Sequence, residues 1–467
     1  MLPTTFITEL GSHLSAQSNI LADPTHAHFK SLLLRWSDID LKVPGAIVQP
    51  ATETDVVATV KLAAQHDVPF VPKSGGHSLW STIGSEGFII DLSLLKALTV
   101  DKETGQITLQ TGVLTKEAND AASDNGLCLP LGSANTAGVV PMALGGGLSG
   151  FAAICGCTSD NILSARLVTA AGELVVVSET SHPDLFWALR GAGQFFGLVT
   201  QLTLQGHPLS MLGTADSTMW TGSIVFPASR LEEVMSVLEP LIKDTTVPTS
   251  GLFIFTAPPP TFETVIMVLP FYLGPASDAE AFYKPLLDLG PLGSELKNVT
   301  YNRKNDSVDA FCGKGGFKRF AGAGGTTFKR EIWKDILKCF EELKTKCPDA
   351  AATAYAFEWD SYKPKNKPTV RDTAFEHKDI RVWAEMLSWY TDPASHAEVF
   401  RIEQEAIERF RSQDGGKAVT YQNWSRDVPL EQLYPGPGTL DRLRALKKEW
   451  DPKGVFTKLL LPETEAA

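Results

Sequence analysis

Three glycine clusters between residues 75 and 197 constrain this chain more than any other feature of its sequence. They lie at 75–76, 145–147 and 191–197, and they interrupt a region of alternating strands and helices. Turns account for single glycines, but three clusters in one region exceed what turns alone require. Because glycine has no Cβ atom, its backbone N–H groups can approach a pyrophosphate closely and point at it. The clusters therefore favour a nucleotide-binding domain.

The glycines do not form the fingerprint of a Rossmann domain. Gly191, Gly193 and Gly197 are spaced one residue too far apart for G-x-G-x-x-G, and they follow the predicted helix DLFWALR instead of a strand. The segment ALGGGLSG also lacks the required strand before it. A standard NAD site is therefore excluded.

The first 207 residues read as short strands and helices. Residues 46–75 form a β-α-β unit, with a strand at 46–48, a helix at 53–66 and a second strand at 68–75. Thr52 stands at the N-cap of that helix. Further elements are predicted by the same patterns: strands within 87–95, 96–101, 106–112, 162–169, 174–177 and 198–204, a helix at 115–126 with Thr115 as cap and Gly126 as stop, and a helix at 183–190.

The middle of the chain, about 210–410, changes character. Strand-like stretches such as GLFIFTAP and TVIMVLPFYLG alternate with amphipathic helices such as SRLEEVMSVLEPLIKD. This pattern predicts an antiparallel sheet with helices on one face. The sequence ends with a further helix, LDRLRALKKEW, stopped by Pro452 and Gly454.

Charge and hydropathy exclude several classes of protein. The formal net charge of −12 argues against a nucleic acid or an anionic membrane as the main partner, because both reward clustered Lys and Arg. No apolar run is long enough to span a bilayer, and the first residues lack a secretory signal, so we expect a cytoplasmic protein. The six cysteines are few and irregularly spaced, which favours reduced thiols over a metal site at Cys155 and Cys157.

Several motifs, taken in order, resemble one known family. They are SGGH (74–77), GSANTAGVVPMALGGGLSGF (132–151), TSDNILSARLVTAAGE, DLFWALRGAGQFFGLVT and the late YQNW (421–424) with LRALKKEWDPKGVF. Together they resemble the FAD-linked oxidases of the vanillyl-alcohol oxidase (PCMH) type, in the berberine-bridge-enzyme-like branch. The resemblance covers nearly the whole chain and is weakest over 210–350.

The resemblance implies an α+β fold with two parts. Residues 1–207, with a PCMH-type core at about 42–207, would form an FAD-binding domain of two subdomains. Residues 208–414 would form a substrate-binding domain, whose large antiparallel sheet is covered by helices. Residues 415–467 would return to the FAD domain as a berberine-bridge-like C-terminal segment.

The resemblance also implies a covalent flavin. In the family, the histidine of the SGGH stretch, here His77, bonds to the 8α-methyl group of FAD and makes the flavin a stronger oxidant. Some members carry a second tether, a cysteine, at the position of Ala134, and Cys128 lies too far upstream to replace it. We therefore expect an 8α-histidyl bond through His77 only.

Further cofactor-binding residues follow from matching positions. Lys73 stands where arginine is commoner, and Tyr421 and Asn423 would meet the isoalloxazine ring; for Tyr421, plain core packing is the alternative. The full set implied by the resemblance is Lys73, Ser74, Gly75, Gly76, His77, Ser78, Gly132, Ser133, Ala134, Thr136, Gly138, Gly145, Gly146, Asn161, Ile162, Val199, Tyr421 and Asn423.

The expected catalytic base is Glu358, in the predicted strand AYAFEWDSY. Alternation with Phe357 and Trp359 presents Glu358 on one face, where desolvation would raise its pKa, although an exposed sheet edge shows the same pattern. Tyr390 and Tyr421 are further catalytic candidates, and Tyr355 and Asp360 are rivals for the base.

The expected activity is oxidation of a small organic, secondary-metabolite substrate at a C–H next to O or N, with O₂ as acceptor. The alternatives are a redox-neutral cyclase that retains FAD structurally and a flavin-free binding protein, against which the intact residues 74–78 argue. Aromatic residues in the middle of the chain hint at an aromatic or polyketide-like ligand, although most are expected in the core: Trp220, Phe253, Phe255, Phe271, Tyr272, Trp359 and Trp389.

Overall fold

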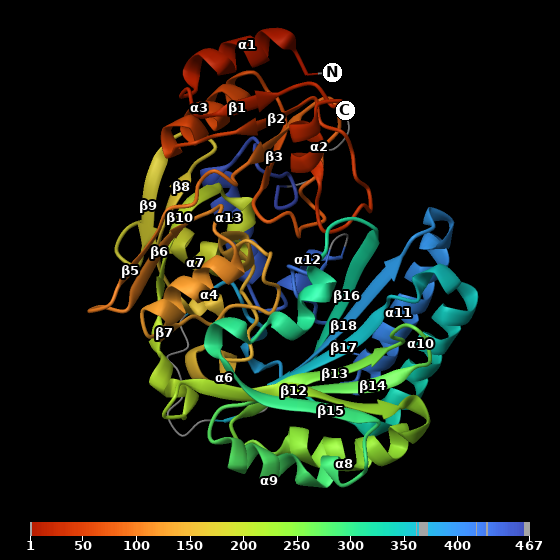
Figure 1. The fold of residues 1–467 in the computed structure, drawn as a ribbon. Helices are drawn as coiled ribbons and strands as arrows, with labels where there is room; N and C mark the ends of the chain where they lie inside the picture. Colours follow the sequence, from red (N-terminus) through yellow and green to blue (C-terminus); the bar gives the residue numbers. More distant parts are fainter. Residues whose placement is uncertain (1, 361, 364–371, 417, 426–427, 462–467) are drawn as a thin grey trace.

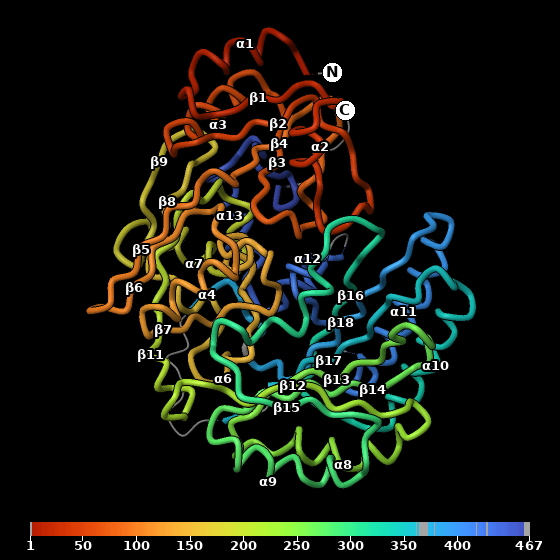
Figure 2. Tube along the Cα trace, in the orientation of Figure 1, coloured from red at the N-terminus to blue at the C-terminus, as the bar shows by residue number. Residues whose placement is uncertain are grey.

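The computed structural model describes residues 2–360, 362–363, 372–416, 418–425 and 428–461 of the chain. Its strands form three larger sheets, which Figures 1 and 2 show in two groups. Two mixed or antiparallel sheets belong to residues before 209, and one large antiparallel sheet belongs to the middle of the chain. The last residues of the predicted C-terminal segment, 462–467, lie outside the described part. The α+β fold class is confirmed.

The first sheet contains the predicted β-α-β unit. Its order is β1-β2-β4-β3, with β2 and β3 both parallel to β4. Thr52 caps helix α3, and Asp55 completes a capping box by accepting from the Thr52 amide. One face of α3, including Val56 and Val60, packs into the core beside the sheet. The elements are α1 (Thr4–His13), β1 (Asn19–Leu21), α2 (Ala27–Leu33), β2 (Ala46–Gln49), α3 (Glu53–Gln65), β3 (Phe70–Lys73) and β4 (Phe88–Asp91).

The second sheet is antiparallel, with the order β5-β6-β10-β8-β9. Its elements are β5 (Leu98–Asp101), β6 (Gln106–Gln110), α4 (Thr115–Asp124), α5 (Val139–Leu144), α6 (Ala152–Cys155), β8 (Ile162–Val168), β9 (Leu174–Ser178), α7 (Pro183–Ala192) and β10 (Leu198–Gln205), with the short pair β7 (Leu127–Cys128) and β11 (His207–Pro208) beside it. One prediction is wrong in detail. Thr115 is the first residue of α4 and not its cap, because its hydroxyl donates to the Ala137 carbonyl.

The large sheet has seven antiparallel strands in the order β15-β12-β14-β13-β17-β18-β16. Helices cover one face of it, as predicted (Figure 1). The elements are β12 (Thr218–Pro227), α8 (Leu231–Lys243), β13 (Thr249–Thr256), β14 (Val265–Tyr272), α9 (Ala276–Leu287), β15 (Gly293–Thr300), β16 (Phe317–Gly325), α10 (Trp333–Lys346), β17 (Ala354–Asp360), β18 (Val382–Tyr390) and α11 (His396–Ser412). The patterns missed both edge strands, because β15 is largely exposed and β16 is rich in glycine.

The C-terminal helices α12 (Leu430–Leu433) and α13 (Thr439–Trp450) lie beside the first half of the chain (Figure 1). Lys447 on α13 is fully buried. Its ammonium group donates to the Phe195 carbonyl at 2.5 Å and to Asp451 at 2.6 Å. Asp451 in turn accepts from the amides of Val455 and Phe456. Within the described residues, no helix is long and apolar enough to cross a membrane.

We expect Lys447→Met to lower the free energy of unfolding by about 3–5 kcal/mol, because it leaves the Asp451 carboxylate buried without its cation. The exposed neighbour Lys448 is the matched control, and Lys448→Met should change stability by about 0.5 kcal/mol or less. Chemical denaturation of the holoprotein measures both. Equal stability of the two variants would contradict the anchoring role of Lys447.

Candidate active site

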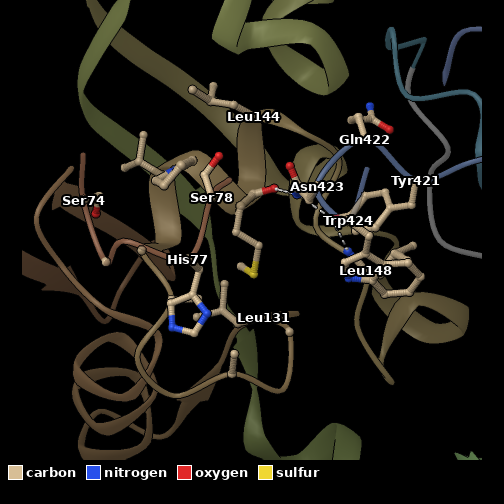
Figure 3. A pocket seen from close by; sticks show the side chains of 18 of the residues that line it. Ser74, His77, Ser78, Leu131, Leu144, Leu148, Tyr421, Gln422, Asn423 and Trp424 are labelled. Atoms are coloured by element: carbon tan, nitrogen blue, oxygen red, sulfur yellow. Dashed lines mark hydrogen bonds between the residues drawn. The ribbon is translucent and has the colours of Figure 1, made fainter. Parts of the chain in front are cut away.

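A cavity of about 540 Å³ lies between the first half of the chain and the large sheet. Loop residues 73–78 and 132–134 border it, the strand ends near Val199 and Gly251 close it, and Tyr421 to Ser425 form another wall. Figure 3 shows His77 across this space from Tyr421 and Trp424. Segments far apart in the sequence therefore meet around one cavity of a size that suits a large cofactor with its substrate.

Glycine allows the two loops of the cavity wall to interlock. A Cβ atom on Gly75 would lie 2.4 Å from the Thr136 carbonyl oxygen and 2.7 Å from the Gly138 amide nitrogen, and neither backbone atom can yield. A Cβ atom on Gly138 would lie 2.2 Å from the Ser74 hydroxyl, which itself donates to the Thr111 carbonyl. Residues without a Cβ are therefore required at both contacts.

The loop leaves a row of backbone donors free. Within the described part of the chain, the amides of Gly75, Gly76, His77 and Ser78 make no hydrogen bond, although all four residues border the cavity. Native proteins seldom leave consecutive amides unpaired in a partly buried loop, so an external acceptor is expected. Gly76 has a φ of +76°, which helps successive N–H groups to converge. This donor set fits an anionic group such as the FAD pyrophosphate.

His77 is held with its ring against the cavity. Its Nε2 atom lies 2.7 Å from the Thr136 hydroxyl, and its ring stacks on Trp36 at 6.1 Å between centroids. Burial, together with the smaller effect of the charges of Lys314 and Lys318, lowers the pKa of His77 to about 4. The imidazole is therefore neutral at pH 7, with one of its two ring nitrogens unprotonated.

Lys73 does not present a free charge to the cavity. Its ammonium group donates to Asp91 at 2.8 Å and to the Leu32 carbonyl at 2.6 Å, and both members of the ion pair are almost completely buried. Lys73 therefore borders the cavity with its charge already paired inside the protein. The side chain instead ties β3 to β4 directly below the loop that carries His77.

Tyr421 and Asn423 brace the glycine-rich segment after α5. The Tyr421 hydroxyl accepts from the amides of Gly147 (3.0 Å) and Leu148 (3.3 Å) and from the Asn423 side chain (2.7 Å). Asn423 also donates to the Met142 carbonyl at 2.9 Å, and both residues border the cavity (Figure 3). Burial raises the pKa of Tyr421, so its ring acts as a neutral wall.

Other predicted cofactor residues fall into two groups. Ser74, Ser78, Gly132, Ser133, Ala134, Gly138 and Val199 border the cavity, and Thr136 reaches it through His77. Gly145, Gly146, Asn161 and Ile162 are not among the lining residues. Gly146 packs against Phe375, and Asn161 donates to the carbonyls of Cys155 and Cys157. These four residues therefore lie behind the residues that line the cavity.

The large sheet contributes charged groups at another part of the cavity. Glu358 on β17 and Glu385 on β18 both line it, and their side chains share a hydrogen bond. Lys304, between β15 and β16, lines the cavity beside them and donates to the carbonyl of Leu131 at 3.2 Å. Burial raises the pKa of Glu358, while Glu385 and Lys304 oppose the rise.

The remaining candidate bases lie elsewhere. Tyr390 is buried on the helix-covered face, where its hydroxyl contacts His396 at 2.5 Å, so this placement does not support a catalytic role. Tyr355 is on the same face. Asp360 accepts from the Ala153 amide at 2.9 Å and is not a lining residue. Burial raises its pKa to about 7.

Sequence reasoning missed Glu385 and Lys304. Glu385 is the one acidic residue in the apolar stretch VWAEMLSWY, which is a usable signal. Lys304 follows an exposed edge strand, and no pattern marks it. The aromatic residues of the middle segment also contribute less than the sequence hints. Of those predicted, only Phe271 lines the cavity, and Trp220, Phe253, Phe255, Tyr272 and Trp359 lie in the core.

The cavity and the comparisons with known proteins together define an FAD-binding enzyme. The family model for the FAD binding domain matches residues 44–178. FAD-linked oxidoreductase hasG of Aspergillus fumigatus is 31% identical over 457 residues, which cover 94% of this chain and 95% of that protein. The chain belongs to the FAD-linked oxidoreductases.

Solved structures share the whole fold. BBE-like 1 of Physcomitrella patens has a TM-score of 0.83 with 20% identity and covers 99% of this chain and 100% of its own. The 6-hydroxy-D-nicotine oxidase of Arthrobacter nicotinovorans has a TM-score of 0.79 with 22% identity and covers 95% of this chain and 97% of its own. These structures confirm the berberine-bridge-enzyme-like fold, while the family model and the Aspergillus relative confirm an FAD-linked oxidoreductase with FAD as its cofactor.

The contact between the two loops predicts that position 75 does not tolerate a side chain. Gly75→Ala should yield protein with less than about one tenth of the wild-type FAD content, since the added Cβ forces the two loops apart by overpacking. The control is Gly293→Ala, at a position where a Cβ atom meets nothing within 4 Å. Flavin absorbance per protein measures both variants. Full FAD content in Gly75→Ala would refute the role of the contact.

Proposed function

We propose that the protein is an FAD-dependent oxidase that removes hydride from a C–H next to O or N of a small, secondary-metabolite substrate and passes electrons to O₂. The carrying observation is the single cavity that His77 and Glu358 both line. When bound, FAD would supply the hydride acceptor, its N5 atom. We further propose the domain division at 207/208 and 414/415, supported by the separation of the sheets.

The chain's own residues would prepare the substrate. Glu358 would accept the O–H or N–H proton while the substrate loses hydride, as a general base does. The apolar wall around Leu252 and Phe271 would exclude water and orient the ligand. Tyr421, whose hydroxyl is engaged by two amides, would form the side of the flavin site and take no proton.

We also propose that His77 bonds covalently to the flavin 8α-methyl carbon. The new C–N bond would replace one methyl C–H and one imidazole N–H, and O₂ would take the two electrons and two protons as H₂O₂. The neutral state of the ring supports the proposal, because only an unprotonated nitrogen is nucleophilic. Ala134 borders the cavity where a second tether would stand, while Cys128 is buried under β11 with its thiol on the His207 carbonyl. We therefore propose one covalent attachment of the flavin, through His77.

Acid precipitation tests the covalent bond. Yellow colour should stay with the wild-type pellet, and His77→Ala should release all of it into the supernatant. Thr136→Val, which removes only the hydroxyl beside the ring, should keep some colour in the pellet but bind flavin more slowly. A coloured His77→Ala pellet would show that another residue holds the flavin.

The oxidase reaction is tested with a panel of aromatic and polyketide-like alcohols and amines. A substrate should bleach the flavin, yield H₂O₂ and give a product lighter by two hydrogens. Glu358→Gln should lower kcat/KM by about 10²–10⁴-fold at unchanged FAD content. In the wild type, kcat/KM should fall as pH drops through the raised pKa of Glu358. A product of unchanged mass would point instead to a redox-neutral cyclase.

A further inference from the structure

A second carboxyl group accompanies Glu358 in the cavity. In the β17–β18 pairing, Glu358 stands opposite Trp383 and Ala356 stands opposite Glu385. Because opposite residues share a face, Glu358 and Glu385 are diagonal neighbours on the cavity side of the sheet, within reach of long side chains. Both are half-buried, and the surface they expose faces the cavity. The opposite face carries Phe357 and Met386 toward the helices.

The contact between the two groups has a chemical requirement. An ionised carboxylate has only acceptor oxygens, so two carboxylates cannot hydrogen-bond to one another. The hydrogen bond between Glu358 and Glu385 therefore needs a proton on one of them. Two carboxylates in hydrogen-bond contact in a desolvated site would also repel each other, which further favours a single shared proton.

The surrounding charges decide which carboxyl group keeps the proton. The Lys304 cation stabilises the ionised form of Glu358 and is not among the groups acting on Glu385. Burial, the negative charge of Glu358 and the hydrogen bond to Glu358 all raise the pKa of Glu385 well above the usual range. Asp360, two residues along β17, is a further carboxyl group near Glu358; burial and the charge of Glu358 raise its pKa, and Arg381 opposes that rise. The Tyr421 hydroxyl accepts from the amides of Gly147 and Leu148.

Lys304 is itself built into the wall. Its ammonium group donates to Leu131 and to the Asn305 side chain (2.9 Å) and lies 5.7 Å from the ring centroid of Phe151. Asn305 is fixed in turn by the Gly132 carbonyl at 3.1 Å. Lys304 is thus held by the cofactor loop while it acts on a carboxylate of the substrate sheet. Burial lowers its pKa to about 8, so it is mostly charged at pH 7.

We propose that Glu385 is a positioning residue: it keeps a proton and donates a hydrogen bond to Glu358. Glu358 then remains an ionised base that lines the cavity. The Lys304 cation determines that Glu358, and not Glu385, is the ionised carboxyl group. During turnover, Glu358 gains the substrate proton and the pair holds two protons, one on each group. The proposal rests on the proposed role of Glu358 as base.

Infrared spectroscopy of the holoenzyme tests the proton directly. At about pH 7, where Lys304 is mostly charged, the C=O stretch of a protonated Glu385 is identified as the band present in the wild type and missing from Glu385→Gln, because Asp360 and Glu403, with pKa values of about 7, contribute equally to both spectra. The band should shift in D₂O and disappear in Glu385→Gln. It should persist in Glu403→Gln, the matched control on α11. Absence of the band from the wild type, or its persistence in Glu385→Gln, would overturn the proposal.

The pH profile tests the consequence for catalysis. Glu385→Leu removes the donor, so the pKa of Glu358 should rise and the acidic limb of kcat/KM should move up by about one pH unit or more. Glu385→Gln keeps an N–H donor, so its acidic limb should stay within about 0.3 unit of the wild type. Both variants are compared at equal FAD content.

An acidic limb that stays in place in Glu385→Leu would refute the positioning role. Full activity of Glu358→Gln would instead refute the proposed base. The two failures are distinguishable, because the infrared band depends on neither substrate nor turnover.

Discussion

The close approach of two backbone loops, residues 74–78 and 132–138, determines where every other part of the site can stand. Gly75 and Gly138 allow a contact that a Cβ atom would prevent at either position. The buried pair of Lys73 and Asp91 holds the start of the first loop on the sheet. Once the loops interlock, four amides have no partner in the described chain, and His77 reaches Thr136. Cofactor donors and the candidate tether thus depend on the same contact.

The large sheet stands over these loops because segments from both halves of the chain are hydrogen-bonded together. Tyr301, just after β15, exchanges hydrogen bonds with Leu129 and donates to Asn119, and Asn135 donates to Asp309 at 2.8 Å. Trp36 donates its indole N–H to the Phe311 carbonyl and stacks on Phe320 of β16 at 5.0 Å. These contacts bring Lys304 to the Leu131 carbonyl and set the separation between the loop of residues 132–138 and the sheet.

Periodicity and capping predicted much of the fold, since both depend on local sequence. The helix after Thr52 and the strands β13, β14, β17 and β18 were predicted from such patterns, whereas the exposed β15 and glycine-rich β16 carry no alternation. The site was harder to predict. Glu358 lies on a face that alternation identifies, but its partner Glu385 depends on strand register, and Lys304 depends on a contact 173 residues away in sequence with Leu131. No local pattern contains either relation.

Desolvation favours the neutral form of the ionisable groups on both sides of the cavity, at His77 on the loop and at Glu385 on the large sheet. It lowers the pKa of His77, where two nearby lysines add to the effect, and it raises the pKa of Glu385, where a carboxylate adds to the effect. A neutral imidazole is the form that can bond to a carbon atom, and a neutral carboxyl is the form that can donate a proton. Burial raises the pKa of Glu358 as well, but there the Glu385 donor and Lys304 oppose the rise and favour the ionised form. The buried Lys304 cation therefore distinguishes the proposed base, Glu358, from two groups that the same burial keeps uncharged.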